Sequence, residues 1–73
     1  MKFKMYEVVR LTIAIPDCAV GAGAVGTVVM VYTDPYEAYE VEFCNEEGRT
    51  LELMAFRPEQ LEAWPPTAGV DAS

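Results

Sequence analysis

With 73 residues, of which 52% are hydrophobic and 23% charged, the chain has room for one domain with a single core. Twelve acidic residues against five basic ones give a net charge of −7. Because affinity for nucleic acids and for anionic membranes depends on basic side chains, this charge argues against both kinds of partner. A small core rich in apolar residues also favours association with another protein, since oligomerisation compensates for limited burial.

The chain contains two cysteines, Cys18 and Cys44, and no histidine. Two cysteines without a CxxC spacing and without histidine do not make a zinc site. The N-terminus lacks the pattern of a secretory signal, and the longest apolar stretch is too short to span a bilayer. We therefore expect a cytoplasmic protein with two reduced thiols.

Glycine and proline divide the chain into short segments without a helical period. Residues 6–15 are rich in apolar and β-branched side chains and predict a first strand that ends at Pro16. Residues 19–26 form an uncharged loop rich in glycine and alanine. Residues 26–32 predict the clearest strand, because nearly every side chain in them favours a pleated backbone.

Residues 38–44 alternate between apolar and acidic side chains. A side-chain period of two predicts a strand with one buried face and one solvated face. The apolar positions that we expect to face the core are Tyr39, Val41 and Phe43. The acidic positions that we expect to face solvent are Glu40 and Glu42.

Residues 45–48 end in glycine and predict a hairpin turn, after which residues 50–56 return as the partner strand. The pattern of the preceding strand predicts which face of this return strand is buried. The residues that we expect on the buried face are Leu51, Leu53 and Ala55. The residues that we expect on the opposite face are Glu52, Met54 and Phe56.

Residues 58–62 predict a single helical or 3₁₀ turn, since proline suits a first helical position. Beyond Trp64 the chain has no pattern, so we expect a domain over residues 1–64 and a flexible tail over residues 65–73. About five short strands and one helical turn near the C-terminus indicate an all-β fold. We expect these strands to close into a small barrel, because closure hides both the apolar face and the strand edges.

The order of these segments resembles that of SH3-like barrels. Residues 6–12 are similar to the first strand of that group, and residues 23–28 match the G-x-x-G-T-V entry to its second strand. Residues 39–43 are similar to the third strand, and residues 57–62 resemble the turn before a short last strand. Residues 1–64 together resemble a small bacterial family, domain of unknown function 4926. That family is in turn similar to the SH3-like barrel domain of the nitrile hydratase β subunit.

Some SH3-like barrels bind RNA through basic residues around the G-x-x-G loop, but here residues 19–25 carry no charge, so that activity is not expected. Catalysis needs convergent titratable groups, and the chain offers no histidine and no lysine beyond Lys4. Gly21, Gly23 and Gly26 precede a strand rather than a helix, which excludes the dinucleotide-binding mechanism. We therefore expect no enzyme activity, no catalytic residues, no cofactor and no metal site.

What remains is surface for a protein partner, and two groups of apolar side chains are candidates. The first group consists of Phe3, Met5, Met54 and Phe56. These four residues form a minor core if the N-terminal segment folds over Met54 and Phe56, and an exposed patch if it does not. The second group consists of Tyr32, Tyr36 and Trp64. Tyrosine and tryptophan are common at the centre of protein interfaces, and the alternative is that these three are turn and tail residues that pack locally.

The sequence favours a non-catalytic protein-interaction module or assembly subunit that binds a protein, with a second copy of itself as the simplest partner. One alternative is an acidic antidote or immunity protein that binds a basic toxin or nuclease, which the net charge suggests. A second alternative is an accessory domain of a multi-subunit enzyme, which the resemblance to a nitrile hydratase subunit allows.

Overall fold

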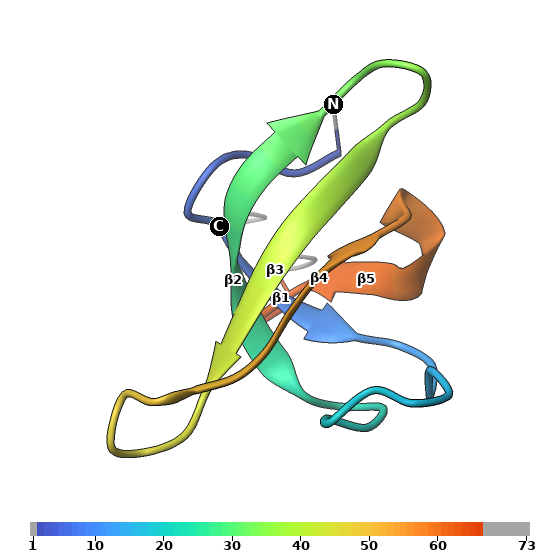
Figure 1. Ribbon diagram of the computed structural model, residues 1–73. Coiled ribbons are helices and arrows are strands. Elements are labelled where there is room, and N and C mark those ends of the chain that lie inside the picture. Colours follow the sequence, from blue (N-terminus) through green and yellow to red (C-terminus); the bar gives the residue numbers. More distant parts are fainter. Residues whose placement is uncertain (1, 67–73) are drawn as a thin grey trace.

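The computed structural model describes residues 2–66, which form one antiparallel sheet of five strands. The elements are β1 (Val8–Leu11), β2 (Val25–Tyr32), β3 (Ala38–Cys44), β4 (Thr50–Phe56), the 3₁₀ turn η1 (Pro58–Gln60) and β5 (Leu61–Ala63). Their spatial order is β4-β3-β2-β1-β5, so that β4 and β5 are the two edge strands (Figure 1). The predictions of an all-β fold and of one 3₁₀ turn near the C-terminus are confirmed.

The sheet is strongly twisted, and β1 and β5 run at a wide angle to β3 (Figure 1). Strands β4 and β5 do not pair with each other, so the hydrogen-bonded sheet is not closed into a barrel. Within residues 2–66, no helix has the length and hydropathy needed to cross a membrane. The predicted tail falls almost entirely on residues 67–73, which lie outside the described residues.

One apolar cluster forms the core, on the concave side of the twisted sheet. Its buried members are Phe3, Val9, Leu11, Val28, Tyr39, Val41, Phe43, Phe56 and Leu61. Two edge-to-face aromatic pairs lie within it, Phe3 with Tyr39 at 5.2 Å and Phe43 with Phe56 at 5.8 Å between ring centroids. The predicted burial of Tyr39 and Phe43 on β3 is therefore confirmed, and that of Val41 with them.

The prediction for β4 is wrong, and the reason is a β-bulge. Cys44 pairs with Thr50, but Phe43 pairs with Glu52, so Leu51 is an extra residue on β4. Without it, Phe43 would lie opposite Leu51, which is the pattern that the sequence predicts. Because side chains alternate with a period of two, one extra residue moves every later side chain to the other face.

As a result, Met54 pairs with Val41 and Phe56 pairs with Tyr39, so both side chains share the core face of β3. Phe56 is buried and Met54 is half-buried against the core. Leu51 and Leu53 remain 49% and 50% exposed on the opposite face. Ala55, which follows on the same face, is exposed as well.

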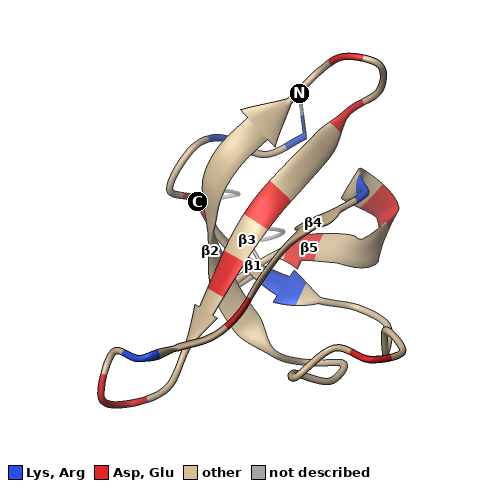
Figure 2. Cartoon of the chain, in the orientation of Figure 1, with Lys and Arg blue, Asp and Glu red and all other residues tan. Residues whose placement is uncertain are grey.

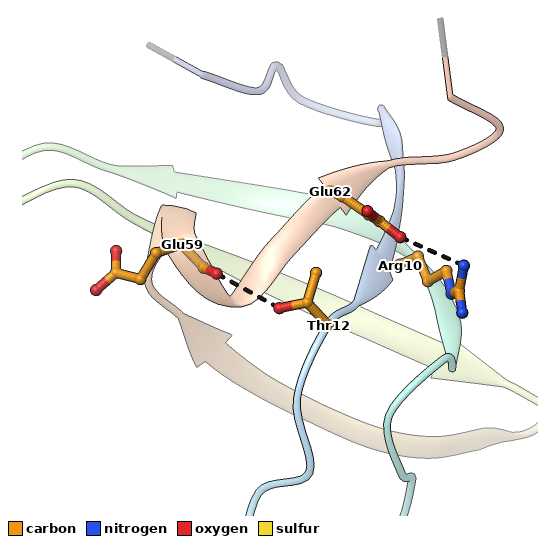
Figure 3. Close-up of polar contacts among 4 residues, drawn as sticks. All are labelled: Arg10, Thr12, Glu59 and Glu62. Atoms are coloured by element: carbon orange, nitrogen blue, oxygen red, sulfur yellow. Dashed lines mark hydrogen bonds and ion pairs between the residues drawn. The ribbon is translucent and has the colours of Figure 1, made fainter. Parts of the chain in front are cut away.

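Strand β1 is shorter than the predicted residues 6–15, because the chain turns at both of its ends. Tyr6 has a positive φ of 66° and donates its backbone N–H to the carbonyl of Val28 at 2.6 Å. Thr12 leaves the strand and donates its N–H to the carbonyl of Gln60 at 2.9 Å. Its hydroxyl also reaches the carbonyl of Glu59 (Figure 3), so the turn η1 replaces a longer strand as the partner of this segment.

The G-x-x-G-T-V segment has a structural explanation. Gly23 adopts a φ of +92°, a backbone conformation that is strained for residues with a side chain. Its N–H donates to the carbonyl of Leu11. At Gly26, an added Cβ would lie 2.7 Å from both the Glu42 carbonyl oxygen and Val41 Cγ1. The absence of a side chain at Gly26 therefore allows this end of β2 to lie close against β3.

The buried hydroxyl group of Tyr39 anchors the start of the N-terminal segment. This oxygen accepts the backbone N–H groups of Lys2 at 2.9 Å and Phe3 at 3.1 Å. The hydroxyl donates to the carboxylate of Glu37, which also accepts the N–H of Lys2. The Tyr39 hydroxyl therefore has a full set of partners, one donor bond and two acceptor bonds, and it holds Phe3 over the core.

Candidate protein-interaction surface

The first predicted contact group does not form a surface patch. Phe3 and Phe56 are each 2% exposed and belong to the main core. Met54 packs against that core, and Met5, two residues after Phe3, is 42% exposed. Neither alternative describes the four residues as a set: Phe3 folds over Tyr39 of β3 and joins Phe56 in the main core, while Met5 stays exposed. Phe3 and Phe56 are therefore structural and offer no area to a partner.

The second predicted group, Tyr32, Tyr36 and Trp64, is exposed but divided among three contacts. The Tyr32 hydroxyl donates to Glu40 Oε1 at 2.5 Å, and this bond raises the pKa of Tyr32 above its ordinary value. The guanidinium of Arg57 lies 5.0 Å from the ring centroid of Tyr36. Trp64 pairs with a different arginine, so the structure does not gather these three residues into one cluster.

That arginine, Arg10, fastens β5 to β1. Its guanidinium lies 4.9 Å from the ring centroid of Trp64, and its Nη1 lies 3.4 Å from Glu62 Oε2 (Figure 3). The backbone N–H of Trp64 donates to the carbonyl of Val8 at 3.1 Å. These contacts account for the position of Trp64 as part of the β1–β5 edge, without any partner protein.

The outward face of β4 forms the candidate surface instead. We define the β4 surface as the side chains of Leu51, Leu53 and Ala55 together with the free backbone edge of β4. Across the sheet, Ala55 pairs with Glu40, which pairs with Met30, and Leu53 pairs with Glu42. The outer face therefore carries an apolar row on β4 beside an acidic row on β3.

The acidic row is visible along β3 in Figure 2. Thr50 donates its hydroxyl to Glu42, and Tyr32 does the same for Glu40. Both carboxylates are thus oriented by neighbours on the same face. The basic residues at the ends of β4 are Arg49 and Arg57, both exposed.

Strand β4 is paired on one side only. Its hydrogen-bonded neighbour is β3, and no other strand within residues 2–66 pairs with it. Glu52, which points to the inner face, accepts the backbone N–H of Ala19 at 2.8 Å. An edge strand leaves a row of backbone N–H and C=O groups without protein partners, and such a row pairs readily with a strand of another chain.

Sequence reasoning missed Leu51 and Leu53 as surface residues, because an added residue in a hairpin leaves no distinct mark in a hydrophobic pattern. It also missed Tyr6, which is 72% exposed and has a positive φ that is uncommon for a bulky residue. The one available signal for β4 was size. Phe56 is the largest apolar residue of that strand, and large aromatic side chains tend to be buried.

The titratable groups with shifted pKa values belong to structural contacts. The Tyr39 hydroxyl bond and the Lys2 N–H lower the pKa of Glu37, and burial followed by the bond to Glu37 raises the pKa of Tyr39. Cys18 and Cys44 are free thiols, as predicted. Among residues 2–66, no three His, Cys, Asp or Glu side chains are grouped so that they could hold a metal ion.

A family model described as Domain of unknown function (DUF4926) matches residues 5–63. The match spans all five strands and most of the chain, so the protein belongs to this family. No curated protein and no solved structure matches the chain.

Proposed function

We propose that this member of the DUF4926 family is a protein-interaction module with an SH3-like barrel fold, and that it acts by contact rather than by catalysis. The observation that carries the proposal is the β4 surface. There, Leu51 and Leu53 are about half exposed on a strand that pairs on one side only.

The barrel part of the proposal is supported by the strand order. Strands β2, β3 and β4 form a continuous antiparallel meander, and β1 extends the sheet on the far side of β2. The chain then passes through η1 and returns as β5 beside β1, which brings the last strand next to the first. The twist of the sheet wraps these strands around one core.

The interaction part is supported by where the apolar residues gather. Single exposed apolar side chains are normal on soluble proteins and need no explanation. Leu51 and Leu53, however, lie at alternate positions of one strand, and Ala55 continues the row. Their side chains flank unpaired backbone groups, so a strand from another chain would bury them and satisfy the backbone at the same time.

The two other functions predicted from the sequence, the acidic antidote and the accessory enzyme domain, would also need a protein-contact surface. The acidic row beside β4 suits a basic partner, but Glu40 and Glu42 already accept hydroxyl groups of this chain. The structure gives neither alternative an observation of its own, and both stay predictions.

The test is affinity capture with the tagged chain in the organism that encodes it, comparing wild type with Leu53→Lys. The matched control is Ile13→Lys, which introduces the same charge at a similarly exposed apolar residue in a loop. We expect wild type and Ile13→Lys to retain a protein, either another chain or untagged copies of this one, and Leu53→Lys to lose it. Recovery of nothing by wild type, or of the same protein by all three, would contradict the proposal.

A further inference from the structure

We propose that the partner at the β4 surface is a second copy of this chain, joined by antiparallel pairing of the two β4 strands about a twofold axis. The inference rests on the proposed function and specifies its partner. Closed twofold dimers are the commonest assemblies of soluble proteins, and they require a surface that is complementary to itself. Strand β4 has such a surface in both its backbone and its side chains.

The backbone meets the requirement directly. Strand β4 has seven residues and pairs only with β3, so no strand among residues 2–66 occupies its outer edge. Two such edges placed antiparallel supply each other with donors and acceptors and continue the sheet from one copy into the next. Strand β4 also contains neither proline nor lysine, the residues that commonly block such pairing.

The side chains select one register. If Leu51 lies opposite Leu53 of the second copy, the twofold axis repeats the pair, so that two leucine pairs form on the outer face. Each leucine is about half exposed in the single chain and would lose much of that exposure. Cross-strand apolar pairs of this kind are the unit of sheet stabilisation.

The charges at the ends of β4 favour the same register. It brings Arg57 opposite Glu47 in the hairpin of the second copy, again twice, and both residues are exposed. In the alternative register, Leu53 lies opposite Leu53 of the second copy. Arg57 then lies opposite Arg49 of the second copy. Opposite charges across neighbouring strands are stabilising and like charges are destabilising, so the first register is preferred.

One pair in this register is unfavourable, and it makes a sharp test possible. In this register Glu52 lies at the twofold axis. It faces Glu52 of the second copy on the inner face of the sheet. Its carboxylate accepts the N–H of Ala19 at 2.8 Å, and a glutamine oxygen can accept the same bond. Glu52→Gln therefore removes the repulsion and keeps the internal contact, so it should strengthen the dimer.

The experiment is sedimentation equilibrium of the purified full chain from micromolar to millimolar concentration. We expect reversible dimerisation. Leu53→Lys should weaken it by about tenfold or more, because the substitution removes both leucine pairs and places two positive charges, one from each copy, near the twofold axis. Glu52→Gln should strengthen it by roughly two- to fivefold. Ile13→Lys should leave it unchanged, and circular dichroism should show the same fold for all variants.

The register is tested by a charge exchange. Arg57→Glu should weaken the dimer, and the double variant Glu47→Arg with Arg57→Glu should restore it. The inference would be overturned by a strictly monomeric chain, or by a dimer whose dissociation constant does not change in Leu53→Lys. Failure of the double variant to restore the dimer would overturn the register. If the chain is monomeric and captures a different protein through Leu53, the proposed function stands and the second copy is the wrong partner.

Discussion

The two edges of the sheet differ in how they are protected. Strand β5 has three residues, carries Glu62 in an ion pair with Arg10, and is followed within three residues by Pro65 and Pro66. Strand β4 has seven residues, no proline, and two half-exposed leucines. Short length, charge and proline are the devices that keep strand edges from pairing with other chains. Strand β5 combines all three, whereas β4 has only the charge of Glu52 among them.

The bulge at Leu51 is a second feature of β4 that normally protects an edge, since bulges disturb regular pairing. It lies at the start of the strand, however, and leaves the run from Glu52 to Phe56 regular. The same bulge turns Leu53 outward. The bulge therefore protects the start of β4 and also places Leu53 and Ala55 on the outer face.

The largest expected effect separates the two faces of β4. Phe56→Ala should lower the free energy of unfolding by about 3–5 kcal/mol, because it opens a cavity beside Phe43 in the core. Leu53→Ala should change it by less than about 0.5 kcal/mol at concentrations where the chain is monomeric. Urea denaturation of both variants measures the difference. Equal losses would mean that β4 has no distinct inner and outer face.

An intermediate effect is expected at the protected edge. Arg10→Ala removes both the ion pair to Glu62 and the contact with the Trp64 ring, and should lower the free energy of unfolding by about 1 kcal/mol. The control is Arg49→Ala at the β4 end, which has no ion pair among the described residues and should change it by less than about 0.5 kcal/mol. The readout is the urea midpoint. A larger loss for Arg49→Ala would reverse the comparison between the edges.

The smallest effect concerns the N-terminal segment, which lies over β3 between the two edges. The pKa of Glu37 is lowered in the folded chain, so its carboxylate stabilises the fold above its ordinary pKa of 4.5. That contribution is lost as the pH falls through the lowered value. Glu37→Gln should therefore be slightly less stable than wild type near neutral pH and equally stable in strong acid. Thermal unfolding across this pH range is the measurement, and a pH-independent difference would contradict the account.

Much of the fold was predictable because local patterns agree with it. The alternation at Tyr39, Val41 and Phe43 predicted β3 and its buried face, and the glycines around residue 26 marked the entry to β2. The faces of β4 were not predictable, because the apolar residues of that strand occupy both faces. With the pattern ambiguous, the register is fixed by the bulge, and the bulge depends on how the hairpin packs against the core.

The contact residues could not be settled from the sequence for a related reason. Phe3 and Phe56 fit either a minor core or an exposed patch, because their burial depends on the N-terminal segment, whose start bonds to the Tyr39 hydroxyl. A hydrogen bond between residues 36 positions apart has no local sequence signal. Trp64 was exposed as expected, but its ring is explained by Arg10 on a neighbouring strand.

The bulge also has a consequence for how relatives of this chain should be compared. Since Leu51 is the extra residue, a homologue with a regular hairpin would carry its core aromatic one position earlier after Thr50. Aligned without a gap, that homologue would seem to exchange buried and exposed positions along the whole strand. A one-residue gap at position 51 would restore the equivalence, and the presence or absence of that gap would divide the family by strand geometry.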